Sequence, residues 1–148
     1  MREIKFKALV FKTRLDNLGS NMQWAGVSEY EELIPVQTIA FDNSDVDLVT
    51  DKEGEEYSFI ENNLRMILQY TGLKDKSGVE IYEGDILQNS DGKRFVIKWG
   101  INSNGFVAQT NETQGKVYSS YHLSFKTIVI GNIYKNPNLL KGGGKSDW

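Results

Sequence analysis

The chain has 148 residues, 39% of them hydrophobic and 25% charged, which is typical of one folded domain and excludes a disordered chain. The formal charge of −3 argues against a protein whose binding depends mainly on neutralising phosphates. The absence of cysteine excludes disulfides and thiolate chemistry, and no stretch approaches the roughly 20 apolar residues of a membrane-spanning helix.

The opening residues 4–10 alternate apolar and polar side chains, with lysine at positions 5 and 7. This period of two predicts a half-buried strand. The lack of an uninterrupted apolar run argues against a secretory signal. We therefore expect a cytoplasmic protein with a β-strand near its N-terminus.

Strands joined by turns are expected through the N-terminal half. Pro35 and the β-branched residues after it favour an extended chain over a helical turn at 28–33. Residues 45–50 and 57–60 flank the sequence DKEGE, which predicts a hairpin with Gly54 in its turn.

Residues 58–72, SFIENNLRMILQYTG, are the one segment with roughly helical spacing of apolar side chains. Asn62 and Asn63 are poor residues for the interior of a helix, and Gly72 would end one. We expect a short turn or helix there, followed by a strand over 65–71.

The pattern of strands is clearer after residue 80. GDILQN and KRFVIKWG flank SDG, which predicts a hairpin whose Phe95, Ile97 and Trp99 share a core-facing side. Further strands are expected in FVAQT, KVYSSY and KTIVIGNIY, whereas LLKGGGKSDW has the composition of a flexible tail. Many short strands, glycine-rich turns and little helix describe a small barrel or a compact sandwich.

Three glycines, Gly72, Gly78 and Gly84, stand six residues apart and raise the question of a phosphate-binding loop. Such a loop needs glycines between a strand and a helix N-terminus, and neither GxGxxG nor GK[ST] is present. Turns are the better interpretation, because glycine adopts positive φ without steric cost. Asp75 and Asp85, with Glu80, are then expected to be turn and surface carboxylates.

The stretch QYTGLKDKSGVEIYEGDIL closely resembles the signature of the YopX family of bacteriophage and prophage proteins. The opening REIKFKA, the sequence VIKWG followed by GF, and the closing VIGNIYKNPNLL share the resemblance, whereas residues 14–63 depart most. The resemblance implies an all-β protein with a small barrel similar to Src-homology-3-like barrels, encoded by a phage-derived gene in a bacterium. It implies no established activity.

Together these observations predict a mainly β protein with little helix. We expect an N-terminal β-rich region at 1–70 that includes a β-hairpin extension, a small SH3-like β-barrel core at 71–140, and a flexible tail at 141–148. The expected location is the cytoplasm of the bacterial host.

The sequence contains no complete catalytic or metal-binding constellation. His122 lies near three serines but without an orienting acid or a GxSxG elbow, so a structural or surface histidine is the better interpretation. The acidic run 42–53 fails the EF-hand register, because Asp47 and not glycine stands at its sixth position, and Glu80 with Glu83 are turn residues by default. We expect no enzymatic activity, cofactor or metal, and the sequence identifies no small-molecule substrate.

Charge is distributed unevenly along the chain. Residues 29–61 contain eleven acidic residues against one lysine, whereas residues 113–146 contain five lysines and no acid, and residues 1–14 contain five basic residues against one acid. Three interpretations stay open: a solvated surface with uneven charge, head-to-tail self-association, and a face that binds nucleic acid.

The function expected from the sequence is that of a phage-encoded, non-enzymatic binding module for a protein partner or for self-association. The alternative is nucleic-acid binding through the basic N- and C-terminal segments, since small barrels stack bases on exposed aromatic side chains. No membrane partner is expected. The candidate binding residues are Lys5, Lys7, Lys116, Tyr118, Tyr121 and Lys126.

Overall fold

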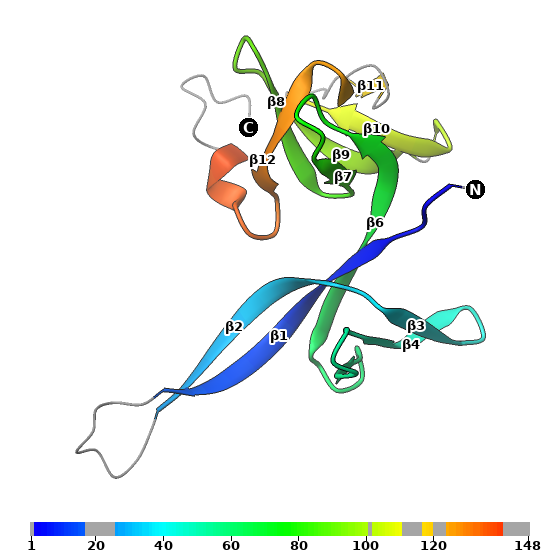
Figure 1. Cartoon of the computed structure of the whole chain (residues 1–148), viewed down its shortest axis with the longest axis vertical. Helices are drawn as coiled ribbons and strands as arrows, with labels where there is room; N and C mark the ends of the chain where they lie inside the picture. The colour runs from blue at the N-terminus through cyan, green and yellow to red at the C-terminus, as the bar shows by residue number, and fades with distance from the viewer. Residues whose placement is uncertain (1, 17–25, 101, 111–116, 120–123, 141–148) are drawn as a thin grey trace. The chain divides into compact units, whose positions relative to one another are not determined.

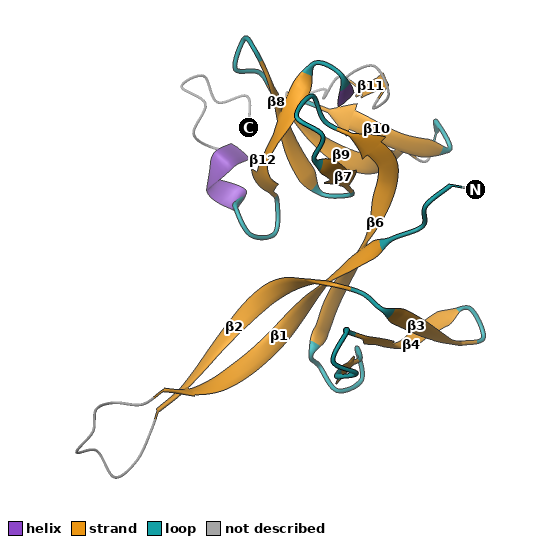
Figure 2. Cartoon of the chain, viewed as in Figure 1, coloured by secondary structure: helices purple, strands orange, loops and turns teal. Residues whose placement is uncertain are grey.

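The computed structural model of the chain describes residues 2–16, 26–100, 102–110, 117–119 and 124–140 (Figure 1). Strands dominate these residues and helix is almost absent, as Figure 2 shows. The prediction of a mainly β protein is therefore confirmed. No helix in the described part of the chain is long and apolar enough to cross a membrane.

The chain divides into two compact units, and the division falls inside strand β6. The N-terminal unit is Lys5–Leu68, and the C-terminal unit is Gln69–Trp148 together with Met1–Ile4. The N-terminal unit contains β1 (Phe6–Asp16), β2 (Gly26–Pro35), β3 (Thr38–Asp42), β4 (Asp45–Thr50), β5 (Glu56–Tyr57) and the start of β6 (Leu64–Lys74). The C-terminal unit contains the end of β6, then β7 (Glu80–Tyr82), β8 (Asp85–Asn89), β9 (Arg94–Gly100), β10 (Gly105–Gln109), β11 (Val117–Ser119), β12 (Thr127–Asn132) and the short 3-10 helix η1 (Pro137–Leu140).

In the N-terminal unit, β1 pairs antiparallel with β2 in continuous register from Lys7 opposite Pro35 to Asp16 opposite Gly26. The start of β6 lies on the other side of β1, so the strand order is β2-β1-β6, and a second sheet has the order β3-β4-β5. The alternation read from the sequence buries Ala8 and Val10 with Ile34 opposite them. These side chains form one core with Val49, Tyr57 and Leu64.

The segment before β6 is a turn and not a helix. Asn62 has a φ of 65°, a conformation that asparagine tolerates better than most residues. The side-chain oxygen of Asn63 accepts the Ser58 N–H at 2.7 Å, and the Ser58 hydroxyl accepts the Glu61 N–H at 3.0 Å. Local side-chain bonds of this kind compete with helix formation, so the strand expected over 65–71 forms and extends to Lys74.

In the C-terminal unit, five strands form a sheet of order β11-β10-β9-β8-β12 that curls into a half-barrel (Figure 1). The predicted hairpin around SDG is confirmed, with Leu87 opposite Phe95. One face of this sheet packs Leu87, Phe95, Ile97 and Ala108 against Ile81 of β7. Burying this apolar face is the main source of stability of the unit.

Trp99 departs from the expectation that it belongs to the core. It shares a face with Phe95 and Ile97, yet 48% of its surface is exposed. It lies near the end of β9, where its ring packs edge-on against Phe106 with 5.1 Å between centroids. The alternation of the strand predicts the face correctly, but it does not show where along the strand the core ends.

The same five-residue turn occurs three times, at residues 51–55, 75–79 and 89–93. In each, a side-chain oxygen of the first residue accepts the N–H groups of the third and fifth residues at 2.8 to 3.0 Å. The fourth residue is a glycine with φ between 82° and 87°. The spacing Asp/Asn-x-x-Gly-x therefore specifies the turn, because the first residue supplies the acceptor and the glycine supplies the backbone conformation.

Asp75 has a further role, which corrects the expectation that it is a surface carboxylate. It is only 7% exposed, and its second oxygen accepts the N–H of Val129 in β12 at 2.8 Å. The Lys76 N–H also donates to the Thr127 carbonyl at 3.0 Å. The turn at 75–79 is thus joined to a strand more than fifty residues later.

Asp85 is also buried, and it connects the same two parts of the chain. Its carboxylate accepts the Tyr82 N–H at 2.8 Å and the side-chain amide of Asn132 at 3.2 Å. Gly84 donates its N–H to Ile97 at 2.8 Å and accepts the N–H of Ile133 at 2.9 Å. Gly84 leads into strand β8 and no helix starts there, which confirms the interpretation as a bend.

Of the other glycines in the motif, Gly78 forms its expected turn. Gly72 has the positive φ that the turn interpretation requires, 87°, but it lies inside β6. The register between β6 and β7 shifts between Tyr70 and Lys74, so Gly72 lies in an irregularity of the strand and not between two strands.

Replacement of Gly84 by alanine should destabilise the protein more than the same change at Gly78. Both have positive φ, which costs a residue with a side chain about 1–2 kcal/mol. An added Cβ at Gly84 would lie 2.8 Å from the Tyr134 ring, whereas nothing lies within 4 Å of one at Gly78. Urea unfolding of Gly84→Ala and Gly78→Ala measures the difference, and equal losses would show that the Tyr134 ring moves aside freely.

Asp75→Ala should lower the free energy of unfolding by about 2–4 kcal/mol, because three backbone N–H groups lose their charged acceptor. Asp91→Ala is the control, since Asp91 is an exposed aspartate at the third position of another such turn, where Asn89 and not Asp91 accepts the N–H groups. It should change stability by less than about 0.5 kcal/mol in the same urea titration. Similar values for the two variants would contradict the role given to Asp75.

Candidate binding groove

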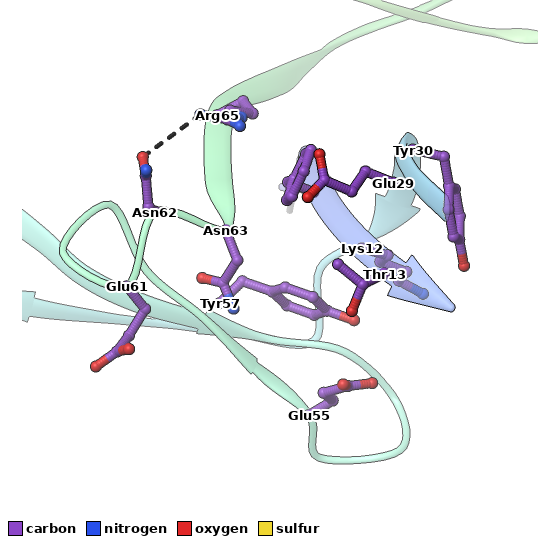
Figure 3. Close-up of a pocket in the computed structure, with 11 residues that line it drawn as sticks. Lys12, Thr13, Glu29, Tyr30, Glu55, Tyr57, Glu61, Asn62, Asn63 and Arg65 are labelled. Atoms are coloured by element: carbon purple, nitrogen blue, oxygen red, sulfur yellow. Dashed lines mark hydrogen bonds between the residues drawn. The ribbon is translucent and has the colours of Figure 1, made fainter. Parts of the chain in front are cut away.

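A groove of about 760 Å³ opens in the N-terminal unit between the β1–β2 pair and the segment 55–65 (Figure 3). Its walls include Thr13 of β1, Glu29 of β2 and Tyr57 of β5. Polar and charged side chains dominate the lining. We refer to this feature as the edge groove.

The edge groove lies where β1 continues beyond the start of β6. The Phe11 N–H donates to the Asn63 carbonyl at 2.8 Å, so the main chain of Phe11 faces β6 and not β2. Thr13, two residues further along the strand, directs its N–H and C=O to the same side. Among the described residues no backbone group bonds to Thr13 from that side. The groove therefore contains a stretch of unpaired strand edge.

Lys12 forms one wall of the edge groove and is held by two partners. Its Nζ lies 3.0 Å from a carboxylate oxygen of Glu32 and 5.9 Å from the ring centroid of Tyr57. The hydrogen bond to Glu32 raises the pKa of Lys12 above its ordinary value, although burial acts in the opposite direction. Lys12 is therefore cationic, and much of its charge is satisfied within the protein.

Tyr57 forms the base of the groove beside Lys12 (Figure 3). Only 2% of its surface is exposed, and its hydroxyl donates to Asp51 at 3.4 Å. Asp51 is also the first residue of the turn at 51–55. Burial raises the pKa of Tyr57 to about 12, so the phenol is neutral at physiological pH.

Arg65, the other cation that lines the groove, is also engaged. Its guanidinium lies 4.8 Å from the ring centroid of Phe11 and 3.9 Å from a carboxylate oxygen of Glu31. It also donates to the side-chain oxygen of Asn62 at 3.4 Å, as the dashed line in Figure 3 marks. Arg65 thus fixes the wall of the groove where β6 begins.

The carboxylates in the lining differ from these cations. The side chains of Glu29, Glu55 and Glu61 have no hydrogen-bond or ion-pair partner among the described residues. Figure 3 shows Glu61 directed away from the groove, which leaves Glu29 on one wall and Glu55 on the other. The available charge of the edge groove is therefore negative.

The surroundings of the edge groove reinforce this sign. A neighbouring cavity of about 380 Å³, which shares Tyr57 and Glu61 with it, is lined also by Asp47 and Glu56. The N-terminal unit has twelve acidic and six basic residues, a formal charge of −6, whereas the C-terminal unit has eight acidic and eleven basic residues, a formal charge of +3. The two units thus differ in the sign of their charge.

The binding residues predicted from the sequence are distributed over both units. Lys5 and Lys7 belong to the N-terminal unit and each has an interaction partner. Tyr118 and Lys126 belong to the C-terminal unit, where the Tyr118 ring packs edge-on against Phe95 with 5.5 Å between centroids. Lys116 and Tyr121 lie outside the described residues, as do His122 and the tail at 141–148. Their roles stay predictions.

The edge groove was not anticipated from the sequence. Thr13, Glu29 and Tyr57 come from three strands, and nothing in their spacing brings them together. The acidic run 29–61 was the available signal, since it predicts the negative charge of this region. Within the described part of the chain, no group of three or more histidine, aspartate or glutamate side chains could hold a metal ion.

Comparisons with known proteins place this small β protein in a family. The model of the family described as YopX protein matches residues 19–141, so the chain belongs to the YopX family. The resemblance seen in the sequence is thereby confirmed. A search of the curated proteins found no match.

The fold is also similar to that of a solved structure. The crystal structure of protein EF1440 from Enterococcus faecalis matches with a TM-score of 0.55 and 23% sequence identity. The alignment covers 95% of this chain and 99% of that one. At this level of identity the match concerns the fold alone.

The raised pKa of Tyr57 predicts a loss of stability in alkali. Between pH 10 and 12 the unfolded chain releases the phenolic proton while the folded chain retains it, so rising pH favours unfolding. By pH 11 this amounts to about 1 kcal/mol. Urea unfolding at pH 8 and pH 11 should show a smaller difference for Tyr57→Phe than for the unaltered protein.

Tyr30→Phe serves as the control for this measurement, because Tyr30 lies in the same groove but is 38% exposed. It should retain the pH dependence of the unaltered protein. If Tyr57→Phe also retained it, the burial of the Tyr57 phenol would not be the cause.

Proposed function

We propose that the protein is a non-enzymatic binding module for a protein partner and that the edge groove is its binding site. The observation that carries this proposal is the unpaired main chain of Thr13 inside a groove of about 760 Å³. An unpaired strand edge offers a row of hydrogen-bond donors and acceptors to a second chain. Domains that bind peptides by adding a strand use this arrangement.

The rigidity of the groove walls supports the same function. Lys12 is held by Glu32 and Tyr57, and Tyr57 is held by Asp51. A binding site that is already ordered loses less conformational entropy when the partner binds. The fixed walls around an open strand edge suit recognition of an extended segment.

The finer expectations from the family resemblance belong to this proposal as well. We propose that the curled sheet of the C-terminal unit is an SH3-like barrel and that the protein is a phage or prophage accessory protein acting in the cytoplasm of its bacterial host. The YopX family membership and the half-barrel sheet support these statements.

Thr13→Pro tests the proposed site. Proline removes the outward N–H at the centre of the free edge, and edge positions tolerate it better than central ones. Leu33→Pro is the matched control, because Leu33 pairs with Leu9, two residues before Phe11, and so directs its N–H to the opposite edge of the sheet, outside the groove lining. Affinity capture from a bacterial lysate should retain the same partner for the unaltered protein and Leu33→Pro, and lose it for Thr13→Pro.

Circular dichroism must first show that both proline variants are folded. The proposal fails if Thr13→Pro captures the same proteins as the unaltered chain. It also fails if nothing is captured and light scattering shows only a monomer, because the partner is either another protein or a second copy of this chain.

Nucleic-acid binding is the second candidate function, and one observation favours it. Trp99 is 48% exposed beside the exposed Lys98, in a unit of charge +3. Single-stranded nucleic acids bind by stacking bases on such rings within a basic surface. Fluorescence polarisation with labelled single strands at low salt tests it, and no change in polarisation would eliminate this function.

A further inference from the structure

We propose that the edge groove binds an extended, basic peptide segment, which adds as a strand beside residues 12–16 of β1. This inference rests on the proposed function and adds the conformation and the charge of the partner. It follows from the main chain of β1, from the unpaired carboxylates of the lining and from the state of the two lining cations.

The main chain determines the conformation of the occupant. Beyond Phe11, strand β1 continues for five residues to Asp16, and β2 covers only one of its edges. Neighbouring strands in a sheet lie about 4.8 Å apart. An incoming segment would therefore lie beside β1 in line with β6, in the space before β6 begins at Leu64. The outward N–H and C=O of Thr13 are placed to pair with it.

The lining determines the charge of the occupant. Glu29 and Glu55 lie on opposite walls, and neither has an ion-pair partner among the described residues. Lys12 and Arg65, which would attract an acidic peptide, already contact Glu32 and Glu31. The carboxylates are therefore the charges left to a ligand, and a lysine or arginine side chain on the added strand would complement them.

The surface around the groove extends this complementarity. The N-terminal unit has a formal charge of −6, and the adjoining cavity adds Asp47 and Glu56 beside Tyr57. A basic segment is attracted by this field before contact, and like charge repels an acidic one. Main-chain pairing with β1 determines the geometry of binding, and the carboxylates make the groove prefer a basic peptide to an acidic one.

Three labelled octapeptides test the inference on the full chain by fluorescence anisotropy. One alternates lysine with valine, the second alternates glutamate with valine, and the third is the lysine peptide with N-methyl groups on alternate amides. The lysine peptide should bind at least tenfold more tightly than the glutamate peptide. The N-methylated peptide should lose this binding, because it has the same charge but cannot pair along the strand.

The double variant Glu29→Gln with Glu55→Gln should weaken binding of the lysine peptide by about tenfold. Each exposed ion pair between a glutamate and a peptide lysine contributes a factor of about three in affinity, and the two factors multiply. The double variant Asp45→Asn with Glu53→Gln removes the same charge from exposed positions outside the groove lining and should have a smaller effect. Equal losses in the two double variants would overturn the assignment of the carboxylates.

Failure of this inference and failure of the proposed function have different signatures. If the lysine and glutamate peptides bind equally, or none of the peptides binds, while capture of a partner still depends on Thr13, the inference is overturned and the proposed site stands. If the N-methylated peptide binds as well as the lysine peptide, strand addition is overturned. If capture does not depend on Thr13, both proposals fall.

Discussion

Besides the burial of its apolar face, the C-terminal unit depends on one polar group, the buried carboxylate of Asp75. It accepts two N–H groups of its own turn and one from β12, so a single side chain joins the middle of the chain to its last strand. Asp85 makes a second connection of the same kind through Asn132. Closing a chain segment of this length costs conformational entropy, and charged acceptors buried among backbone donors help to offset that cost. Part of the family signature is therefore explained by folding, since Asp75 and Gly78 form a turn and Asp85 and Gly84 connect to the last strand.

The parts of the fold that were predictable from the sequence are those with local causes. Alternating apolar residues identified β1 and β9, and the Asp/Asn-x-x-Gly-x spacing specifies a turn from five consecutive residues. Asp75 and Asp85 were assigned to the surface because nothing local shows that a carboxylate will meet backbone donors from a distant strand. Trp99 was assigned to the core for a similar reason, since the alternation of a strand does not mark where the opposing layer ends.

The edge groove illustrates the same limit at the level of the site. Its negative charge could be anticipated from the acidic run, but its existence depends on where β6 starts relative to β1, which is a tertiary property. The asparagines at 62 and 63 make this difference by forming a turn, so that β6 pairs with β1 only as far as Phe11. The two asparagines thus end the pairing of β6 with β1 and leave the rest of that edge of β1 open to a second chain.

The contact between Gly84 and Tyr134 has a consequence for the evolution of the family. The aromatic ring lies 2.8 Å from the place where a Cβ of residue 84 would be, although the two residues are fifty positions apart in the sequence. A side chain at position 84 would therefore clash with the ring unless residue 134 were smaller. Relatives that bear a side chain at the first position should therefore have a smaller residue at the second, and the pair should appear as correlated substitutions when many members are aligned.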